Sequence, residues 1–240
     1  LYQLTDGTML VGSNSGLWIE LSIDSFKLEV HQRELWVKGL FQASNGVIWC
    51  RSNQGIFSYD GQSWTKHWSS TIPSWGHIGL RSSIHEAPDG TMWFNTDGGV
   101  GSFKDGIWKE QYLPSSAQHN LFVELTTTND GRIWAVGASG AWWSAGNDKW
   151  VHAIQTNQWI GGFIESPTGR YWIGAWELSS HSSPVTTAYS DGDRWIEIPI
   201  DQGGQITFFE DDEGTLFAAG NGIYKWRESN QTWLKLTGDE

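Results

Sequence analysis

Short runs of apolar and aromatic residues alternate along the chain with turn dipeptides that contain glycine, and no stretch has convincing helical periodicity. The segment from Asp89 to Trp93 is typical, because the turn dipeptide Asp-Gly opens a β-favouring run there. A second Asp-Gly follows at Asp105, and its glycine stands two residues before Trp108 of the next run. Asp-Gly between such runs favours a hairpin, since Gly adopts φ > 0 at no steric cost. The segment therefore predicts consecutive antiparallel strands.

This unit recurs along the whole chain at intervals of 38 to 45 residues. Three residues after the glycine of the first turn comes Leu, Trp or Phe, and a second turn and a further strand follow. A β-favouring run also precedes each first turn, so every copy predicts four short strands, A to D, with tight A–B and C–D turns. The first-turn glycines are Gly7, Gly46, Gly90, Gly131, Gly169 and Gly214.

Four antiparallel strands in a repeat of this length are typical of a propeller blade. We therefore expect an all-β fold, a six-bladed β-propeller with four antiparallel strands per blade, that forms one domain over residues 1–240. The expected blades cover residues 1–34, 35–76, 77–118, 119–157, 158–201 and 202–240. The Trp residues at repeat positions are expected to fill the core between the sheets, because flat rings pack well there.

Composition narrows the classes of partner. The formal net charge of −12 argues against nucleic acid and anionic membranes, which are bound by clustered Lys and Arg. Cys50 is the only cysteine of the chain, and its place after Trp49 in a predicted strand indicates a buried structural thiol. No run of 18 apolar residues is present, so we expect no membrane insertion in this segment. The chain begins at Leu1 without Met, and we expect it to be processed or excised from something longer.

The repeat resembles that of a known family. Asp-Gly-x-x-Trp, a Gly, and then a second Asp-Gly closely followed by Trp stands at Asp89–Trp108 and, with small changes, at Asn45–Trp64 and Asp130–Trp150. This pattern is similar to the two-component-regulator propeller repeat and covers essentially the whole chain, although Leu10 and Phe217 replace the first Trp in two copies. The resemblance implies a bacterial ligand sensor, periplasmic or extracellular and part of a larger sensor protein, that often recognises oligosaccharide fragments.

Binding residues are expected at the end of the blades opposite the tight turns, where the D–A and B–C loops are long. The longest predicted B–C loop covers Ala175–Thr187. The Trp residues that the repeat does not require are Trp36, Trp75, Trp159 and Trp176, all in or at the edge of these loops. Exposed Trp rings can stack on the apolar face of a sugar, although Trp36 and Trp159 could equally cap their blades.

Polar neighbours of these Trp residues could supply hydrogen bonds to a ligand: His77, Arg81, His119 and His181. The loop histidines leave two alternatives open: the protein is a propeller lyase or hydrolase, or the histidines bind a metal ion. A protein-interaction platform is a third alternative. No nucleophile elbow, phosphate loop, His-Glu-x-x-His or paired-Cys spacing is present. The sequence therefore favours a non-catalytic protein without a cofactor or metal that binds a small molecule or oligosaccharide.

Polar side chains also recur four residues before the first-turn glycine. We expect them to satisfy backbone and turn groups rather than to bind a ligand. These residues are Gln3, Gln42, Glu86, Glu165 and Glu210.

Overall fold

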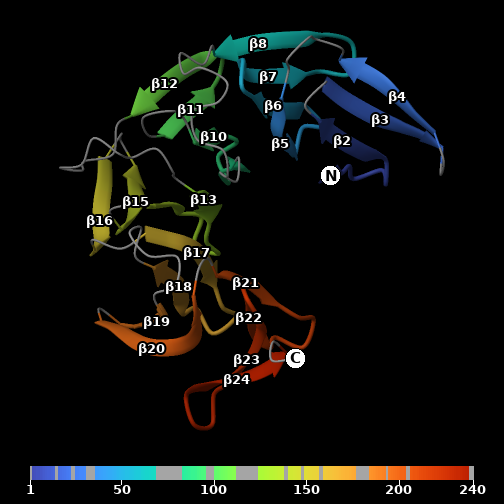
Figure 1. The fold of residues 1–240 in the computed structure, drawn as a ribbon. Coiled ribbons are helices and arrows are strands. Elements are labelled where there is room, and N and C mark those ends of the chain that lie inside the picture. The colour runs from blue at the N-terminus through green and yellow to red at the C-terminus, as the bar shows by residue number, and fades with distance from the viewer. Residues whose placement is uncertain are drawn as a thin grey trace. The chain divides into compact units, whose positions relative to one another are not determined.

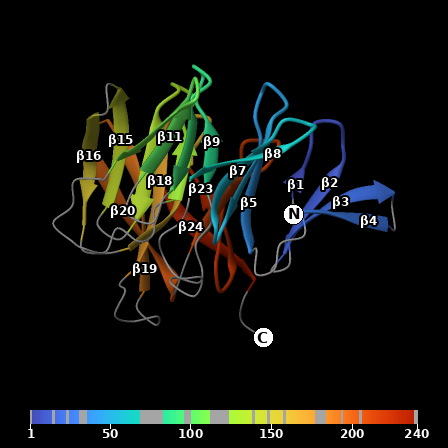
Figure 2. The ribbon, with the colours of Figure 1, turned by 90° about the horizontal axis from the view of Figure 1, so that it is seen from above.

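The computed structural model describes residues 2–13, 16–22, 25–30, 36–68, 83–95, 100–111, 124–137, 140–146, 149–156, 159–176, 184–192, 194–203 and 206–237. The regular elements of these residues are all β-strands. They form six four-stranded sheets, in each of which the strands pair in chain order. Every pair for which a register is established is antiparallel, as in β3 and β4, which lie side by side in Figures 1 and 2. The six-bladed all-β prediction is confirmed.

The sheets are numbered here as blades 1 to 6 in chain order. Their strands are β1 Tyr2–Gln3, β2 Met9–Ser13, β3 Gly16–Ser22 and β4 Ser25–Val30; β5 Val37–Gln42, β6 Ile48–Ser52, β7 Gly55–Tyr59 and β8 Trp64–Trp68; β9 Ile84–Glu86, β10 Met92–Asn95, β11 Val100–Lys104 and β12 Ile107–Gln111; β13 Glu124–Thr127, β14 Ile133–Gly137, β15 Gly140–Gly146 and β16 Lys149–Gln155; β17 Trp159–Glu165, β18 Tyr171–Trp176, β19 Pro184–Asp191 and β20 Arg194–Gly203; β21 Thr207–Glu210, β22 Leu216–Ala219, β23 Ile223–Arg227 and β24 Thr232–Thr237.

Blade 5 differs from its predicted outline. Its B–C connection is shorter than the predicted loop Ala175–Thr187, because β18 continues to Trp176 and β19 begins at Pro184. The β-branched residues of this segment continue the ladder, with Thr187 opposite Gly174. Proline is tolerated at the first position of a strand, where its missing N–H costs little. The last strand of the blade, β20, runs two residues past the predicted boundary at 201.

The A–B turns of all six blades share one pair of backbone hydrogen bonds. In blade 1 the N–H of Gly7 donates to the carbonyl of Leu4, and the N–H of Leu4 donates to the carbonyl of Thr8. The first-turn glycines have φ between 77° and 91°, the left-handed region that the sequence pattern predicted. In four blades the side chain of an Asp or Asn before the glycine accepts a hydrogen bond from the backbone N–H of the residue after the glycine, as Asp6 accepts from Thr8. That backbone bond is the main reason why the pKa of Asp6 is lowered.

Blades 5 and 6 have Thr168 and Glu213 before the turn glycine and cap the turn from an earlier position. Ser166 Oγ accepts the N–H of Arg170 at 3.2 Å, and Asp211 Oδ1 accepts the N–H of Thr215 at 2.7 Å. The turn therefore keeps its shape although its usual acceptor is replaced.

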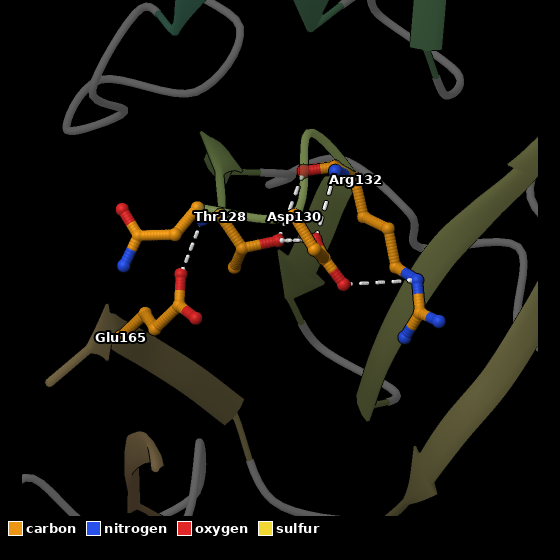
Figure 3. Close-up of polar contacts among 5 residues, drawn as sticks. Thr128, Asp130, Arg132 and Glu165 are labelled. Atoms are coloured by element: carbon orange, nitrogen blue, oxygen red, sulfur yellow. Dashed lines mark hydrogen bonds and ion pairs between the residues drawn. The ribbon is translucent and has the colours of Figure 1, made fainter. Parts of the chain in front are cut away.

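A side chain of the following blade ties down the A–B turn at three blade junctions. Gln42 Oε1 accepts the N–H of Thr5 at 2.8 Å. Glu86 accepts both the N–H and the hydroxyl of Ser44, each at 2.7 Å. Glu165 likewise accepts the N–H of Asn129, as Figure 3 shows beside the turn of blade 4. These bonds confirm for Gln42, Glu86 and Glu165 that the side chain four residues before the turn glycine satisfies turn groups, and we call each one a junction latch.

The chain divides into two compact units, residues 1–113 with 121–127 and residues 114–120 with 128–240. In the first unit, Trp49, Ile56 and Phe94 belong to a buried cluster between blades 2 and 3. In the second unit, Trp172 and Trp226 pack edge to face with ring centroids 4.6 Å apart, in the cluster between blades 5 and 6.

The recurring Trp residues occupy two environments. Those of the B strands are mostly core, such as Trp49, Trp134 and Trp172, each at most 4% exposed. Those near the start of the D strands, such as Trp64 and Trp195, are half-buried because D is the outer strand of its sheet. The core assignment therefore holds for the B-strand rings and only in part for the D-strand rings. Cys50 is a buried free thiol, as predicted, and burial raises its pKa to about 12.

Candidate functional site

The structure tests the predicted ligand-binding residues unevenly. Trp75, His77, Arg81, His119 and His181 lie outside the described residues. Their assignment to a binding face therefore stays a prediction, and so does the alternative that the loop histidines act in catalysis.

Trp36 stands immediately before β5, at the loop end of blade 2. Its N–H donates to Asn53 Oδ1 at 2.7 Å, and the N–H of Asn53 donates back to the carbonyl of Trp36 at 3.1 Å. Asn53 belongs to the B–C turn of the same blade. This pair of bonds ties the entry of the blade to its B–C turn and leaves the Trp36 side chain half-buried at the loop end.

Two of the predicted Trp residues come together in blade 5. Trp159 opens β17 and Trp176 closes β18, and the two residues are directly paired in the antiparallel register. One arrives from the D–A connection and the other leads into the B–C connection, so the register brings both to the loop end of one sheet. The Trp159 side chain is 8% exposed, so it is largely covered by protein in this structure.

A groove of about 310 Å³ lies between blades 4 and 5. Its base is apolar and consists of Ile173, Ala175 and Ala188 from blade 5 with Ala153 and Ile154 from blade 4. Because side chains alternate along a strand, the residues of each blade-5 strand that line the groove share one face of the sheet. The volume is at the lower end of the range usual for small-molecule sites.

Polar groups and one aromatic ring complete the lining of this groove. Trp195 and Glu197 stand two residues apart on β20 and add a half-buried indole and an exposed carboxylate. Thr186 contributes a hydroxyl group from β19, and Gln155 and Thr156 contribute polar groups at the end of β16. An indole, a carboxylate, an amide and hydroxyls over an apolar base can bind a polyhydroxylated ring by stacking and hydrogen bonding.

The sequence did not identify Trp195 or Glu197 as site residues. Trp195 occupies the repeat position at the first or second residue of every D strand after blade 1, so the repeat pattern alone assigns it to the scaffold. Strand alternation places both residues on one face, but it does not reveal that this face is turned toward blade 4. The sequence signals that pointed to blade 5 were the length of its insertion and the two Trp residues that the repeat does not require, Trp159 and Trp176.

A serine–histidine pair in blade 2 belongs to the packing of the sheet. Ser58 Oγ and His67 Nε2 are 2.7 Å apart across β7 and β8. The imidazole lies against Trp49 and Phe103, with ring centroids 4.9 and 4.5 Å away, and burial lowers its pKa. In a catalytic triad the second ring nitrogen is held by a carboxylate. The described residues place no such carboxylate on His67.

Within the described parts of the chain, no group of three or more His, Cys, Asp or Glu side chains is arranged to hold a metal ion. No helix of the described residues has the length and apolar character needed to cross a membrane.

Comparison with solved structures places the fold among the β-propellers. The extracellular domain of BT4673 from B. thetaiotaomicron, assigned to a one-component system, superposes with a TM-score of 0.67 at 14% identity, over 99% of this chain and 32% of that one. The extracellular domain of BT3049 from the same organism, assigned to a hybrid two-component system, gives 0.61 at 16% identity over 90% and 31%. The Dos1 propeller gives 0.67 at 11% identity over 94% and 66%.

This chain thus spans about a third of the length of the two B. thetaiotaomicron structures. No protein-family model and no curated protein sequence matches it. At these identities the similarity shows the fold. It agrees at that level with the resemblance of the repeat to two-component-regulator propellers.

Proposed function

We propose that the chain is a non-catalytic ligand-binding propeller, a single domain over residues 1–240 that serves as the sensing part of a larger extracellular or periplasmic protein. The proposal draws on the repeat pattern and on the similarity to extracellular domains of BT4673 and BT3049. The ligand is a carbohydrate or a similar small polar molecule, bound at the loop end of the blades.

The observation that carries the proposal is the pairing of Trp159 with Trp176 at the loop end of blade 5, beside the strands that line the groove between blades 4 and 5. Because the Trp159 ring is largely covered, the described ring that is open for stacking is the half-buried indole of Trp195, which lines the groove together with Glu197. Such a combination suits sugars, whose C–H faces stack on rings and whose hydroxyls donate to carboxylates.

A titration with a panel of neutral oligosaccharides tests the proposal, with Trp emission and calorimetry as readouts. We expect at least one saturable ligand, and Trp176→Ala and Glu197→Gln should each weaken its binding at least about tenfold, the loss expected for one good contact. Glu110→Gln is a matched control, because this exposed carboxylate also stands two residues after the Trp near the start of a D strand.

Two results would count against the proposal. The first is the absence of any saturable response across the panel. The second is a ligand whose affinity is unchanged in both blade 5 variants, because its site would then lie elsewhere. Turnover of any tested sugar that is lost in His77→Ala or His119→Ala would favour the lyase or hydrolase alternative instead.

A further inference from the structure

The groove between blades 4 and 5 lies where blade 5 lacks an aromatic side chain that the other blades have. In every blade the fourth residue after the first-turn glycine lies on the B strand and pairs with one residue of the C strand. The pair contains an aromatic residue in five blades: Val11–Trp18, Cys50–Phe57, Phe94–Gly101, Ala135–Trp142 and Ala218–Tyr224. In blade 5 the pair is Ile173–Ala188, and both residues line the groove. The groove therefore takes the place of a missing ring.

The D strand adds a second difference at the same level of the sheet. In three blades its residue opposite the aromatic C-strand residue is basic: Lys66 opposite Phe57, His152 opposite Trp142 and Lys235 opposite Tyr224. The Lys66 ammonium lies 5.5 Å from the Phe57 centroid, and the His152 ring stacks on Trp142 with centroids 4.6 Å apart. Blade 5 instead has Glu197 opposite Ala188. It therefore lacks both the ring and the base and has a carboxylate beside the space they leave.

The side chains around this space face the same way. Residues paired across neighbouring strands point to one face of a sheet, so Ile173 on β18, Ala188 on β19 and Glu197 on β20 all face blade 4 (Figure 1). Trp195 stands two residues before Glu197 and shares that face, roughly 7 Å away along the strand. Its ring packs against the apolar cluster that contains Ile173 and Ala188. A positive group bound at the carboxylate is thus within reach of the indole face.

Glu197 is the only charged side chain among the residues that line the groove. It makes no hydrogen bond or ion pair with a described residue. The basic residues of the neighbouring strand β16 do not line the groove, since Lys149 stands at its turn end and His152 stacks on Trp142 on the other face of blade 4. A carboxylate without a cation, next to an indole, favours a positively charged ligand over a neutral or negative one.

We propose that the groove prefers a sugar that carries an ammonium group, an inference that rests on the proposed carbohydrate-binding function and narrows its ligand class. The sugar ring occupies the space beside Ala188 and stacks on Trp195. Its ammonium pairs with Glu197, and its hydroxyls bond to Thr186 and Gln155, which line the same groove. The ligand thereby supplies both the ring and the positive charge that other blades provide from their own C and D strands.

Glucosamine and N-acetylglucosamine are the probes, titrated calorimetrically against the whole chain in low salt at about pH 6, where the sugar amine is charged. The two share one ring, but acetylation removes the charge. Glucosamine should bind at least about fivefold more tightly, because it alone makes an exposed ion pair and a cation–π contact. Raising the salt concentration should reduce this ratio, since the ion pair is screened.

Glu197→Gln should abolish the preference, so that the two sugars bind within about twofold of each other. Glu110→Gln is the matched control, because Glu110 holds the same position on the D strand of blade 3, opposite Gly101. There the B-strand partner of Gly101 is the buried ring of Phe94, and no space is left. The preference for glucosamine should be unchanged in this control.

A second variant tests the missing ring. Ala188→Tyr introduces the residue that blade 6 has at this position, Tyr224, and should weaken both sugars at least about tenfold by filling the groove. Ala188 is buried, so the variant is first compared with wild type in urea. If it is destabilised, Glu197→Gln decides the question, because its side chain is exposed and no contact with a described residue is removed.

The outcomes separate this inference from the proposed function. Equal affinities of the wild type for the two sugars, or a preference that persists in Glu197→Gln, would overturn the inference even where neutral oligosaccharides bind. No saturable binding of any sugar, charged or neutral, would refute the proposed function and the inference together. Glucosamine binding that is lost in Glu197→Gln, without a response to any neutral sugar, would support the inference and contradict the binding of neutral sugars.

Discussion

The hydroxyl of Thr187 connects blades 5 and 6 through the core, and its removal provides a sharp test of the packing described here. The residue is 0% exposed. Its Oγ1 donates to the carbonyl of Ile198 at 2.6 Å and accepts from Trp233 Nε1 of blade 6 at 2.9 Å. Thr187→Val preserves the shape of the side chain and deletes both bonds.

The expected cost follows from the groups left behind. The indole N–H of Trp233 loses its acceptor, and the carbonyl of Ile198 loses an additional donor. Leaving a buried polar group unsatisfied costs about 1–3 kcal/mol, and Trp233 is only half-buried, so we expect the free energy of unfolding to fall by about 2–3 kcal/mol in total.

Thr127→Val is the same chemical change at a hydroxyl that makes no hydrogen bond to a described residue. Thr127 Oγ1 is buried and has no hydrogen-bond partner among the described residues. Replacing an unsatisfied buried hydroxyl by a methyl group should leave stability unchanged or raise it by up to about 1 kcal/mol.

Urea denaturation, followed by Trp emission and circular dichroism, measures the stability of both variants. The midpoints are compared on condition that the dependence of the unfolding free energy on urea concentration is the same. The pair should differ by about 2–4 kcal/mol, with Thr187→Val less stable. A Thr187→Val protein as stable as the wild type, or two variants that shift equally, would refute the assignment of the Thr187 hydroxyl as a junction contact.

Other parts of the structure give three further predictions. Glu86→Ala removes both acceptors from Ser44, so the free energy of unfolding measured in urea should fall by about 1–3 kcal/mol, whereas the same change at an exposed D-strand carboxylate should have little effect. Burial lowers the pKa of His85 below its ordinary 6.5, because the folded protein favours the neutral imidazole. The stability that this imidazole contributes is therefore fully present above pH 6.5 and is lost as the pH falls through the folded-state pKa. Unfolding midpoints at about pH 7.5 and about pH 5 should therefore differ less in His85→Gln than in wild type, and equal differences would contradict this. An added Cβ at Gly162 would lie 2.5 Å from the carbonyl oxygen of Ile206, so Gly162→Ala should cost about 1–3 kcal/mol, and unchanged stability would show that the blades do not approach so closely.

The repeat pattern predicted the fold because the residues that determine each turn are adjacent in the sequence. A glycine at a left-handed turn position, such as Gly90 at φ 79°, is visible in the sequence without any knowledge of distant contacts. The start of the third strand of blade 5 at Pro184 was missed, because an insertion interrupts the count from turn to turn, and pairing with neighbouring strands decides where the strand begins.

The candidate site was harder to predict than the scaffold. Trp176 and Trp159 were identified because the repeat does not require them, but their pairing depends on the register of β17 and β18. Trp195 was hidden by the repeat itself, because a residue that fills a scaffold position can also line a groove.

The junction latches have a consequence for how opening of the molecule can be followed. The backbone N–H groups of Thr5, Ser44 and Asn129 each bond to a side chain of the next blade. Native-state hydrogen exchange at such an amide requires that this contact open, so each of the three amides reports the opening free energy of one junction. Pro88 and Pro167 carry no exchangeable proton at the equivalent positions. An exchange experiment on this chain would therefore follow three junctions separately, each through its own latch amide. The two junctions with Pro88 or Pro167 at this turn position would have to be followed through the amides of neighbouring residues.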